Sequence, residues 1–228
     1  MIGENLLKIK KMIADAAGRS GRDPSEIKLL AVSKHIDIPE IKEAYANGQL
    51  LFGENYAQEA REKIEQLDKA ISWHFIGHLQ SNKAKLAARI FQMIETVDNL
   101  KIARILNTHA REIDKTLEIL VQINIGRESQ KSGVYPLDAG QFLKDLGGLE
   151  HLRVRGLMAM PPFTEDPEET RPYFRTLKNM ADRFQEEGLF ADNAPAVLSM
   201  GMSGDFEVAV EEGSTLVRVG TAIFGSRT

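Results

Sequence analysis

The strongest constraint on this chain is an alternation of short apolar runs with helix-like segments that recurs along its whole length. The runs are rich in Val, Ile, Leu and Phe, as expected of strands buried on both faces of a parallel sheet. The segments between them carry apolar residues at helical spacing. Eight strands are predicted: Ile27–Lys34, Leu50–Asn55, Trp73–His78, Phe91–Val97, Thr116–Ile125, Leu152–Met160, Val197–Met200 and Thr215–Thr221.

Eight strands alternating with helices, with no second run of strands, are typical of a (β/α)8 TIM barrel. An extra helix is predicted before the first strand, because the apolar residues between Asn5 and Gly18 trace one helical face. The alternative is an open, doubly wound sheet. No glycine-rich dinucleotide turn follows the first strand, which favours the barrel. We therefore expect a single α/β barrel domain over residues 1–228.

The composition is that of an ordinary soluble protein. Hydrophobic residues make up 43% of the 228 residues, enough for a sizeable core, and the net charge of −4 gives no reason to expect nucleic-acid or membrane binding. The chain has no cysteine, so disulfides, zinc-thiolate sites and cysteine nucleophiles are excluded. No signal peptide and no apolar stretch long enough to span a membrane is evident. A cytoplasmic protein is expected.

Lys34 is the first candidate functional residue, because it ends the apolar strand Ile27–Lys34. Burial lowers the pKa of a lysine, and a neutral amine is the nucleophile that condenses with an aldehyde. A Schiff-base lysine at the end of the first strand is one interpretation of this residue, although the stretch by itself favours the other one. The alternative is an ordinary charged strand end that reaches into solvent.

An anion site is predicted at the loops after the last two strands, where barrels often bind phosphate. These loops are Met200–Asp205 and Gly220–Ala222, and a short helix at Phe206–Glu212 directs its N-terminus at the same place. Glycine backbone N–H groups and hydroxyls suit an anion there. The alternative is that the glycines only form tight turns and that Ser203 or Asp205 caps the helix.

Three further polar positions leave alternatives open. Arg218 precedes Gly220 by two residues, so it either faces the barrel interior, where it needs a partner, or points outward to a helix carboxylate. His74 and His78 lie four apart on a predicted strand, hence on one face, but no third metal ligand is evident and no metal site is expected. Lys83 is expected at a solvated helix start.

Six sequence motifs occur in the same order along this chain as in a known protein family. They are LAVSK (30–34), FGENY (52–56), WHFIGHLQSNK (73–83), RGLMAM (155–160), LSMGMS (198–203) and VRVGTAIFG (217–225). They resemble the pyridoxal phosphate homeostasis protein family, whose members are similar to the N-terminal barrel of alanine racemase. The resemblance covers nearly the whole chain. One departure is the segment His35–Ile38, where many relatives have a Thr-Lys-Pro type of sequence.

The resemblance implies a cofactor and the residues that bind it. Lys34 would form the Schiff base with pyridoxal 5′-phosphate, Asn55 would line the cofactor ring, and Arg218 would approach the pyridine nitrogen. A cation there disfavours protonation of the ring and makes it a poorer electron sink. The phosphate would be held by Ser199, Gly220 and Thr221, with Met200 and Ser203 close by.

The resemblance also implies a carrier rather than an enzyme. A racemase uses a tyrosine from a second domain as its other acid/base, and this sequence ends just after strand eight, with no tyrosine on a recognisable racemase motif. We expect a monomer that buffers the reactive aldehyde in the cell, supplies it to apo-enzymes transiently and has no catalytic residues. The alternatives are a cofactor-dependent amino-acid enzyme of the racemase type and a cofactor-free Schiff-base aldolase.

Overall fold

The first strand, β1 (Lys28–Val32), is buried on both faces except at Lys28, as its continuous apolar run requires. It lies parallel to β2 (Leu51–Glu54) on one side and to β8 (Leu216–Val219) on the other. In the computed structural model, which describes residues 1–225, this pairing closes a barrel of eight parallel strands in sequence order. The other strands are β3 (Ser72–Phe75), β4 (Met93–Val97), β5 (Leu117–Ile123), β6 (Leu152–Ala159) and β7 (Val197–Ser199). The predicted TIM barrel is confirmed.

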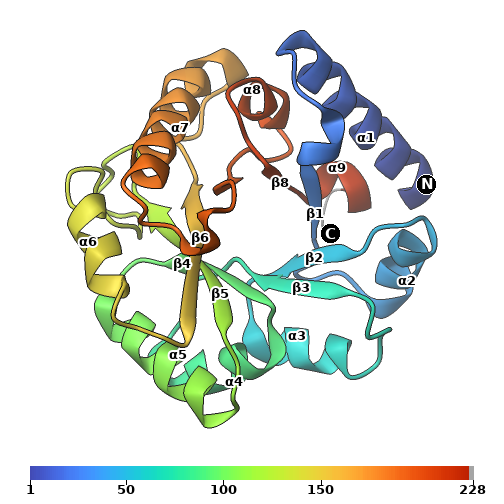
Figure 1. Ribbon diagram of the computed structural model, residues 1–228. Helices are drawn as coiled ribbons and strands as arrows, with labels where there is room; N and C mark the ends of the chain where they lie inside the picture. Colours follow the sequence, from blue (N-terminus) through green and yellow to red (C-terminus); the bar gives the residue numbers. More distant parts are fainter. Residues whose placement is uncertain (226–228) are drawn as a thin grey trace.

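Helices surround the barrel on all sides (Figure 1). Their apolar stripes pack against the outer face of the sheet and form the main hydrophobic core. The α-helices are α1 (Ile2–Arg19), α2 (Ile38–Ala46), α3 (Ala57–Ile64), α4 (Ala84–Ile90), α5 (Leu100–Glu112), α6 (Ala139–Leu146), α7 (Arg171–Glu186), α8 (Phe206–Glu211) and α9 (Thr221–Phe224). Short 3₁₀ turns are η1 (Pro24–Glu26), η2 (Ser81–Lys83), η3 (Pro167–Thr170) and η4 (Ala191–Asn193).

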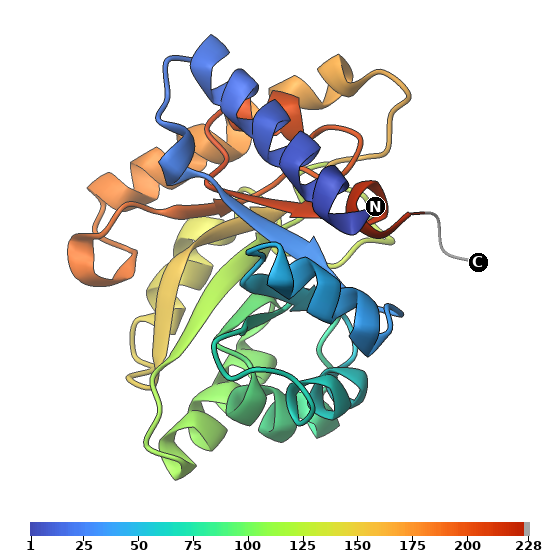
Figure 2. The same cartoon turned by 90° about the vertical axis from the view of Figure 1, so that its right-hand side faces the viewer.

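The predicted extra N-terminal helix is present. It lies on the outside of the barrel, between the first helix after β1 and the last helices of the chain. Helix α1 contacts α2, α8 and α9 through a buried face that includes Leu6, Ile9 and Ile13 (Figure 2). Asn5 Nδ2 donates to the carbonyl oxygen of Ile223 at 2.9 Å, which ties α1 to α9. Within residues 1–225, no helix is both long and apolar enough to cross a lipid bilayer.

The eighth strand is shorter at its C-terminal end than the sequence predicted. It was expected to extend to Thr221, but β8 ends at Val219, and Thr221 is the first residue of α9. Gly220 is the N-cap residue between the two, so the chain turns into a helix where the sequence pattern suggested continued strand. The turn places backbone N–H groups at the carboxyl end of β8.

The barrel interior combines apolar clusters with buried polar groups. Leu30 and Val32 of β1 pack with Leu216, while Met93, Leu120 and Met158 form a second small cluster. Arg218 is paired in register with Leu30, and Leu30 and Val32 share one face of β1 by strand alternation. Arg218 is 4% exposed, and its partners lie inside the barrel, so the outward alternative considered for it is wrong.

Candidate functional site

Lys34 lies just beyond β1, in the turn that leads to α2, rather than within the strand. The preceding residue, Ser33, still pairs with the neighbouring strand, because its N–H donates to the carbonyl oxygen of Gly53 at 3.0 Å. Lys34 is half-buried at the carboxyl end of the barrel. This is the end at which barrel proteins place their functional residues.

A chain of four buried side chains occupies the barrel interior. Arg218 Nη1 donates to Ser199 Oγ at 2.5 Å, and Arg218 Nη2 donates to the carbonyl oxygen of Ala159 at 2.9 Å. Ser199 Oγ in turn donates to Glu95 Oε2 at 2.5 Å. The other oxygen of Glu95, Oε1, lies 2.7 Å from His74 Nδ1. We call these four residues, Arg218, Ser199, Glu95 and His74, the interior network.

Charge balance accounts for the stability of this buried arginine. Burial lowers the pKa of the Arg218 guanidinium, while the negative charges of Glu95 and Asp205 act in the opposite direction. Burial also raises the pKa of Asp205, which is opposed by the N–H of Met202 and by Arg218. A buried guanidinium is therefore held within the barrel by one fully buried carboxylate and a second nearby.

The loops after β7 and β8 meet and present backbone and hydroxyl groups. The N–H of Gly220 lies 3.4 Å from Ser203 Oγ, and the N–H of Met202 donates to Asp205 Oδ1 at 2.7 Å. Gly201 has φ of 93°, and a Cβ there would lie 2.6 Å from the Cβ of Ala209, so only glycine suits this turn. Thr221 is exposed at the start of α9. Ser203, Gly220 and Thr221 thus form a small cup with donors, which we call the loop cup.

Asn55 follows β2 and lines an open cavity of about 400 Å³. Its Oδ1 atom is buried and finds no hydrogen-bond donor in the described part of the chain. The cavity also contacts Tyr56, His78 and Lys83, so Lys83 is half-buried rather than fully solvated as expected. An acceptor without a donor at the mouth of the barrel is suited to contact a bound polar molecule.

The predicted site residues fall into two groups. The structure places Lys34, Asn55, Ser203, Gly220 and Thr221 on the segments that follow strands at the carboxyl end of the barrel, with Thr221 as the first residue of α9. The others are inside: Arg218 and Ser199 belong to the interior network, and the side chain of Met200 is fully buried in the hydrophobic core.

The prediction that His74 and His78 share one face of a strand is wrong. Strand β3 ends at Phe75, so His78 is an exposed loop residue whose Nδ1 lies 3.4 Å from Ser132 Oγ, whereas His74 faces Glu95. Among residues 1–225, no three His, Asp or Glu side chains are grouped to hold a metal ion.

Sequence reasoning missed Glu95 and Lys63. Glu95 is a carboxylate within a strand that is buried throughout and mostly apolar, so an acidic residue in an apolar run could have pointed to it. Lys63 carried no such signal, because it lies among the charged residues of α3 and only the fold shows that it is 6% exposed.

Comparisons with known proteins agree on one family. Residues 8–228 match the family model for the alanine racemase N-terminal domain. A pyridoxal phosphate homeostasis protein of Pasteurella multocida is 42% identical over 99% of this chain and 97% of its own length. One of Escherichia coli strain K12 is 43% identical with the same coverage.

Solved structures show the same likeness. PipY of Synechococcus elongatus is 36% identical to this chain and has been solved both without PLP and with PLP bound. The two structures superpose on this one with TM-scores of 0.85 and 0.84, and each match covers 99% of this chain and 100% of PipY. Alanine racemase of Clostridium difficile 630 superposes with a TM-score of 0.77, but it is 17% identical, and the match spans 56% of that enzyme. The racemase shares the fold.

Proposed function

The chain belongs to the family of pyridoxal phosphate homeostasis proteins, within the alanine racemase N-terminal domain family, and from this membership we propose that it binds pyridoxal 5′-phosphate (PLP) through Lys34. The observation that carries the proposal is the common location of Lys34, Asn55 and the loop cup at the carboxyl end of the barrel. The relative PipY has been solved with PLP bound and superposes over 99% of this chain.

The residues present fit the cofactor. PLP has an aldehyde, a polar pyridine ring and a phosphate, and each has a chemical counterpart here. The loop cup supplies the Gly220 N–H and the hydroxyls of Ser203 and Thr221, which are suitable donors for a phosphate. The buried Oδ1 of Asn55 requires a donor that the described residues do not provide, and the hydroxyl on the pyridine ring of PLP can donate. PLP supplies the reactive aldehyde when bound.

Each residue then has a defined role. The amine of Lys34 would hold the aldehyde group, and the loop cup would hold the phosphate. Arg218, kept in place by Ser199 and Glu95, would supply a fixed positive charge toward the pyridine nitrogen. Asn55 lines the ring on the β2 side. Ser199 contributes through Arg218, because its hydroxyl donates to Glu95 and accepts from Arg218.

A protein that retains PLP in this way limits the free concentration of a reactive aldehyde. We propose that it acts in intracellular PLP homeostasis as a cytoplasmic monomer that buffers the cofactor and transfers it to apo-enzymes. The similarity to alanine racemase does not add catalysis to this proposal, because at 17% identity it is a similarity of fold.

The deciding experiment is to incubate the purified protein with PLP, record its visible absorbance, reduce it with borohydride and locate the label by peptide mass. We expect a yellow protein with a pyridoxyl group on Lys34, and loss of this label in Lys34→Ala. Lys28→Ala is the matched control, because Lys28 is exposed at the start of β1, the end of that strand farther from Lys34. A colourless wild type, or unchanged labelling of Lys34→Ala, would contradict the proposal.

A further inference from the structure

The two peptide groups on either side of Lys34 are held by side chains from other elements. The carbonyl oxygen of Ser33 accepts a hydrogen bond from Lys63 Nζ at 2.7 Å. On the other side, the N–H of His35 donates to Glu59 Oε1 at 2.6 Å. Both Glu59 and Lys63 belong to α3, where their i, i+4 spacing places them on one face. One helix therefore contacts the chain before and after Lys34.

Lys63 joins these contacts into one unit. Its Nζ also donates to Glu59 Oε1 at 2.6 Å and to Glu54 Oε1 at 2.9 Å. Glu54 Oε1 accepts a further hydrogen bond from Ser33 Oγ at 2.7 Å. The ammonium thus uses all three of its protons within the protein, on two carboxylates and one carbonyl.

Burial makes this arrangement difficult to replace. Glu54 is 0% exposed and Lys63 is 6% exposed, so neither charge can return to solvent if its partner is lost. Burial raises the pKa of Glu54, whereas its contacts with Lys63 act to lower it. The ammonium of Lys63 is therefore the group that offsets the burial of this carboxylate.

The backbone beside Lys34 needs such support. His35 has φ of 60°, the left-handed region that a residue with a side chain adopts at some strain. Its ring also lies 5.3 Å from the ring of Tyr56, which precedes α3. A strained conformation persists only where its surroundings fix it, and here the fixing groups come from α3 and its N-terminal neighbour.

We propose that Lys63 is a positioning residue for Lys34: together with Glu59 it clamps the Ser33 and His35 peptide groups and so sets the direction in which the Lys34 side chain leaves the backbone. The inference rests on the proposed function, because it assigns Lys63 a role in presenting Lys34 to PLP. Lys63 contacts neither the loop cup nor Arg218, and it acts through the backbone alone.

The test is Lys63→Met, which keeps most of the length of the side chain and removes its charge. Lys115→Met is the matched control, since Lys115 is also partly buried and its Nζ donates to the carbonyl oxygens of Ala88 and Phe91, at 2.8 and 2.6 Å, away from the site. After loading with PLP and borohydride reduction, we expect the fraction of label on Lys34 to fall roughly tenfold in Lys63→Met and to stay unchanged in Lys115→Met.

A second pair of variants guards against loss of the fold. Glu59 is half-buried, so Glu59→Ala should fold, lose the His35 contact and lower labelling of Lys34 several-fold. Glu59→Gln retains an oxygen that can accept from His35 N–H and should restore most of the labelling. Wild-type labelling of Lys34 in both Lys63→Met and Glu59→Ala would overturn the inference.

A readout without PLP separates this inference from the proposed function. Amide hydrogen exchange at His35 should accelerate at least about tenfold in Lys63→Met and Glu59→Ala, and not in Lys115→Met. If the wild type does not take up PLP, the proposed function fails, and the exchange data still decide whether the clamp exists. Unchanged exchange at His35 would show that Lys63 does not hold this segment.

Discussion

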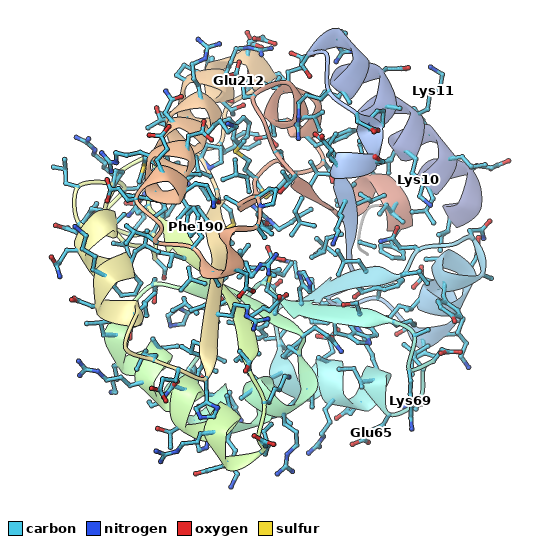
Figure 3. The ribbon with its side chains drawn as sticks, viewed as in Figure 1. Lys10, Lys11, Glu65, Lys69, Phe190 and Glu212 are labelled. Carbon is cyan, nitrogen blue, oxygen red and sulfur yellow. The ribbon has the colours of Figure 1, made fainter. Side chains whose placement is uncertain are left out.

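Two arginine-centred clusters in this molecule differ mainly in where they lie. The interior network places Arg218 inside the barrel against Ser199 and Glu95, at 4% exposure. The second cluster lies on the outside, where Arg171 at the start of α7 donates to Glu168, Glu211 and Glu212 at 2.6–3.0 Å. Figure 3 shows Glu212 at the outer ring, between α7 and α8. We call this second set the outer cluster.

The pKa values of the two arginines are shifted in opposite directions. Burial dominates at Arg218 and lowers the pKa of its guanidinium, whereas hydrogen bonds to three carboxylates raise the pKa of Arg171. The outer cluster has more ion pairs, yet water screens each of them. The interior network has fewer, and each depends on its partner, because an unpaired buried charge is strongly unfavourable. The number of ion pairs is therefore a poor guide to which cluster matters more.

The largest expected effect is that of Glu95→Ala. It removes the fully buried carboxylate that accepts from Ser199 and faces His74, and leaves Arg218 with less compensating charge. We expect the free energy of unfolding to fall by about 3–5 kcal/mol, as for other broken buried pairs. Urea denaturation measures this. A decrease no larger than that of an outer-cluster variant would remove the distinction between the two clusters.

Ser199→Ala should have the next largest effect. The hydroxyl bridges Arg218 to Glu95, and its removal leaves both charged groups one hydrogen bond short. A decrease of about 1–3 kcal/mol is expected. The same variant should release PLP faster than wild type, measured from the decay of visible absorbance. Ser214→Ala is a useful comparison, because Ser214 is equally buried but hydrogen-bonds only to backbone carbonyls.

The pH dependence of stability should differ in sign between Asp205, a carboxylate whose charge acts on Arg218 but which lies outside the interior network, and Glu212 of the outer cluster. The pKa of Asp205 is raised by burial above its ordinary value of 3.8, so the folded protein holds this proton more tightly and loses stability as pH rises through that pKa. The pKa of Glu212 is lowered, first by Arg175, below 4.5, so its contribution is present above 4.5 and is lost as pH falls through the folded value.

Denaturation of two variants between pH 3 and pH 7 tests these signs. Relative to wild type, Asp205→Asn should become more stable as pH rises, and Glu212→Gln should become less stable. Asparagine retains an oxygen that can accept from the N–H of Met202, which limits other changes. The same slope for both variants would refute the assigned pKa directions.

Arg171→Met should have the smallest effect. Its ion pairs are partly exposed, so we expect a decrease of at most about 1 kcal/mol, which shrinks further as salt is added because exposed pairs are screened. The effect of Glu95→Ala should be nearly independent of salt. A loss in Arg171→Met as large as in Glu95→Ala would show that the outer cluster does more than join α7 to α8.

The sequence predicted the barrel because strand and helix periodicity are local properties. Strands Leu152–Met160 and Phe91–Val97 were located within two residues of β6 and β4 at each end. The errors lie where local pattern and fold disagree. Thr221 continues the apolar alternation of β8 but begins α9, and His78 follows β3 at strand-like spacing but lies in a loop.

The sequence predicted the position of several site residues but not the contacts between them. Lys34, Arg218, Gly220 and Thr221 follow from strand ends and from motifs, because parallel strands bring their carboxyl ends together. The partners of Arg218 could not be predicted. Ser199 and Glu95 are 104 residues apart in the sequence, and no local pattern reports that their side chains meet inside the barrel.

The sequence by itself determined the number and order of the strands, the helix before them and the lysine that follows the first strand, since these depend on periodicity and residue type. Only the tertiary structure decided which charges are buried together. It joined Lys63 to the backbone around Lys34, and Glu95 to Arg218 through Ser199. The physical reason is that desolvation and charge pairing depend on contacts between distant segments, which exist only after the barrel has closed.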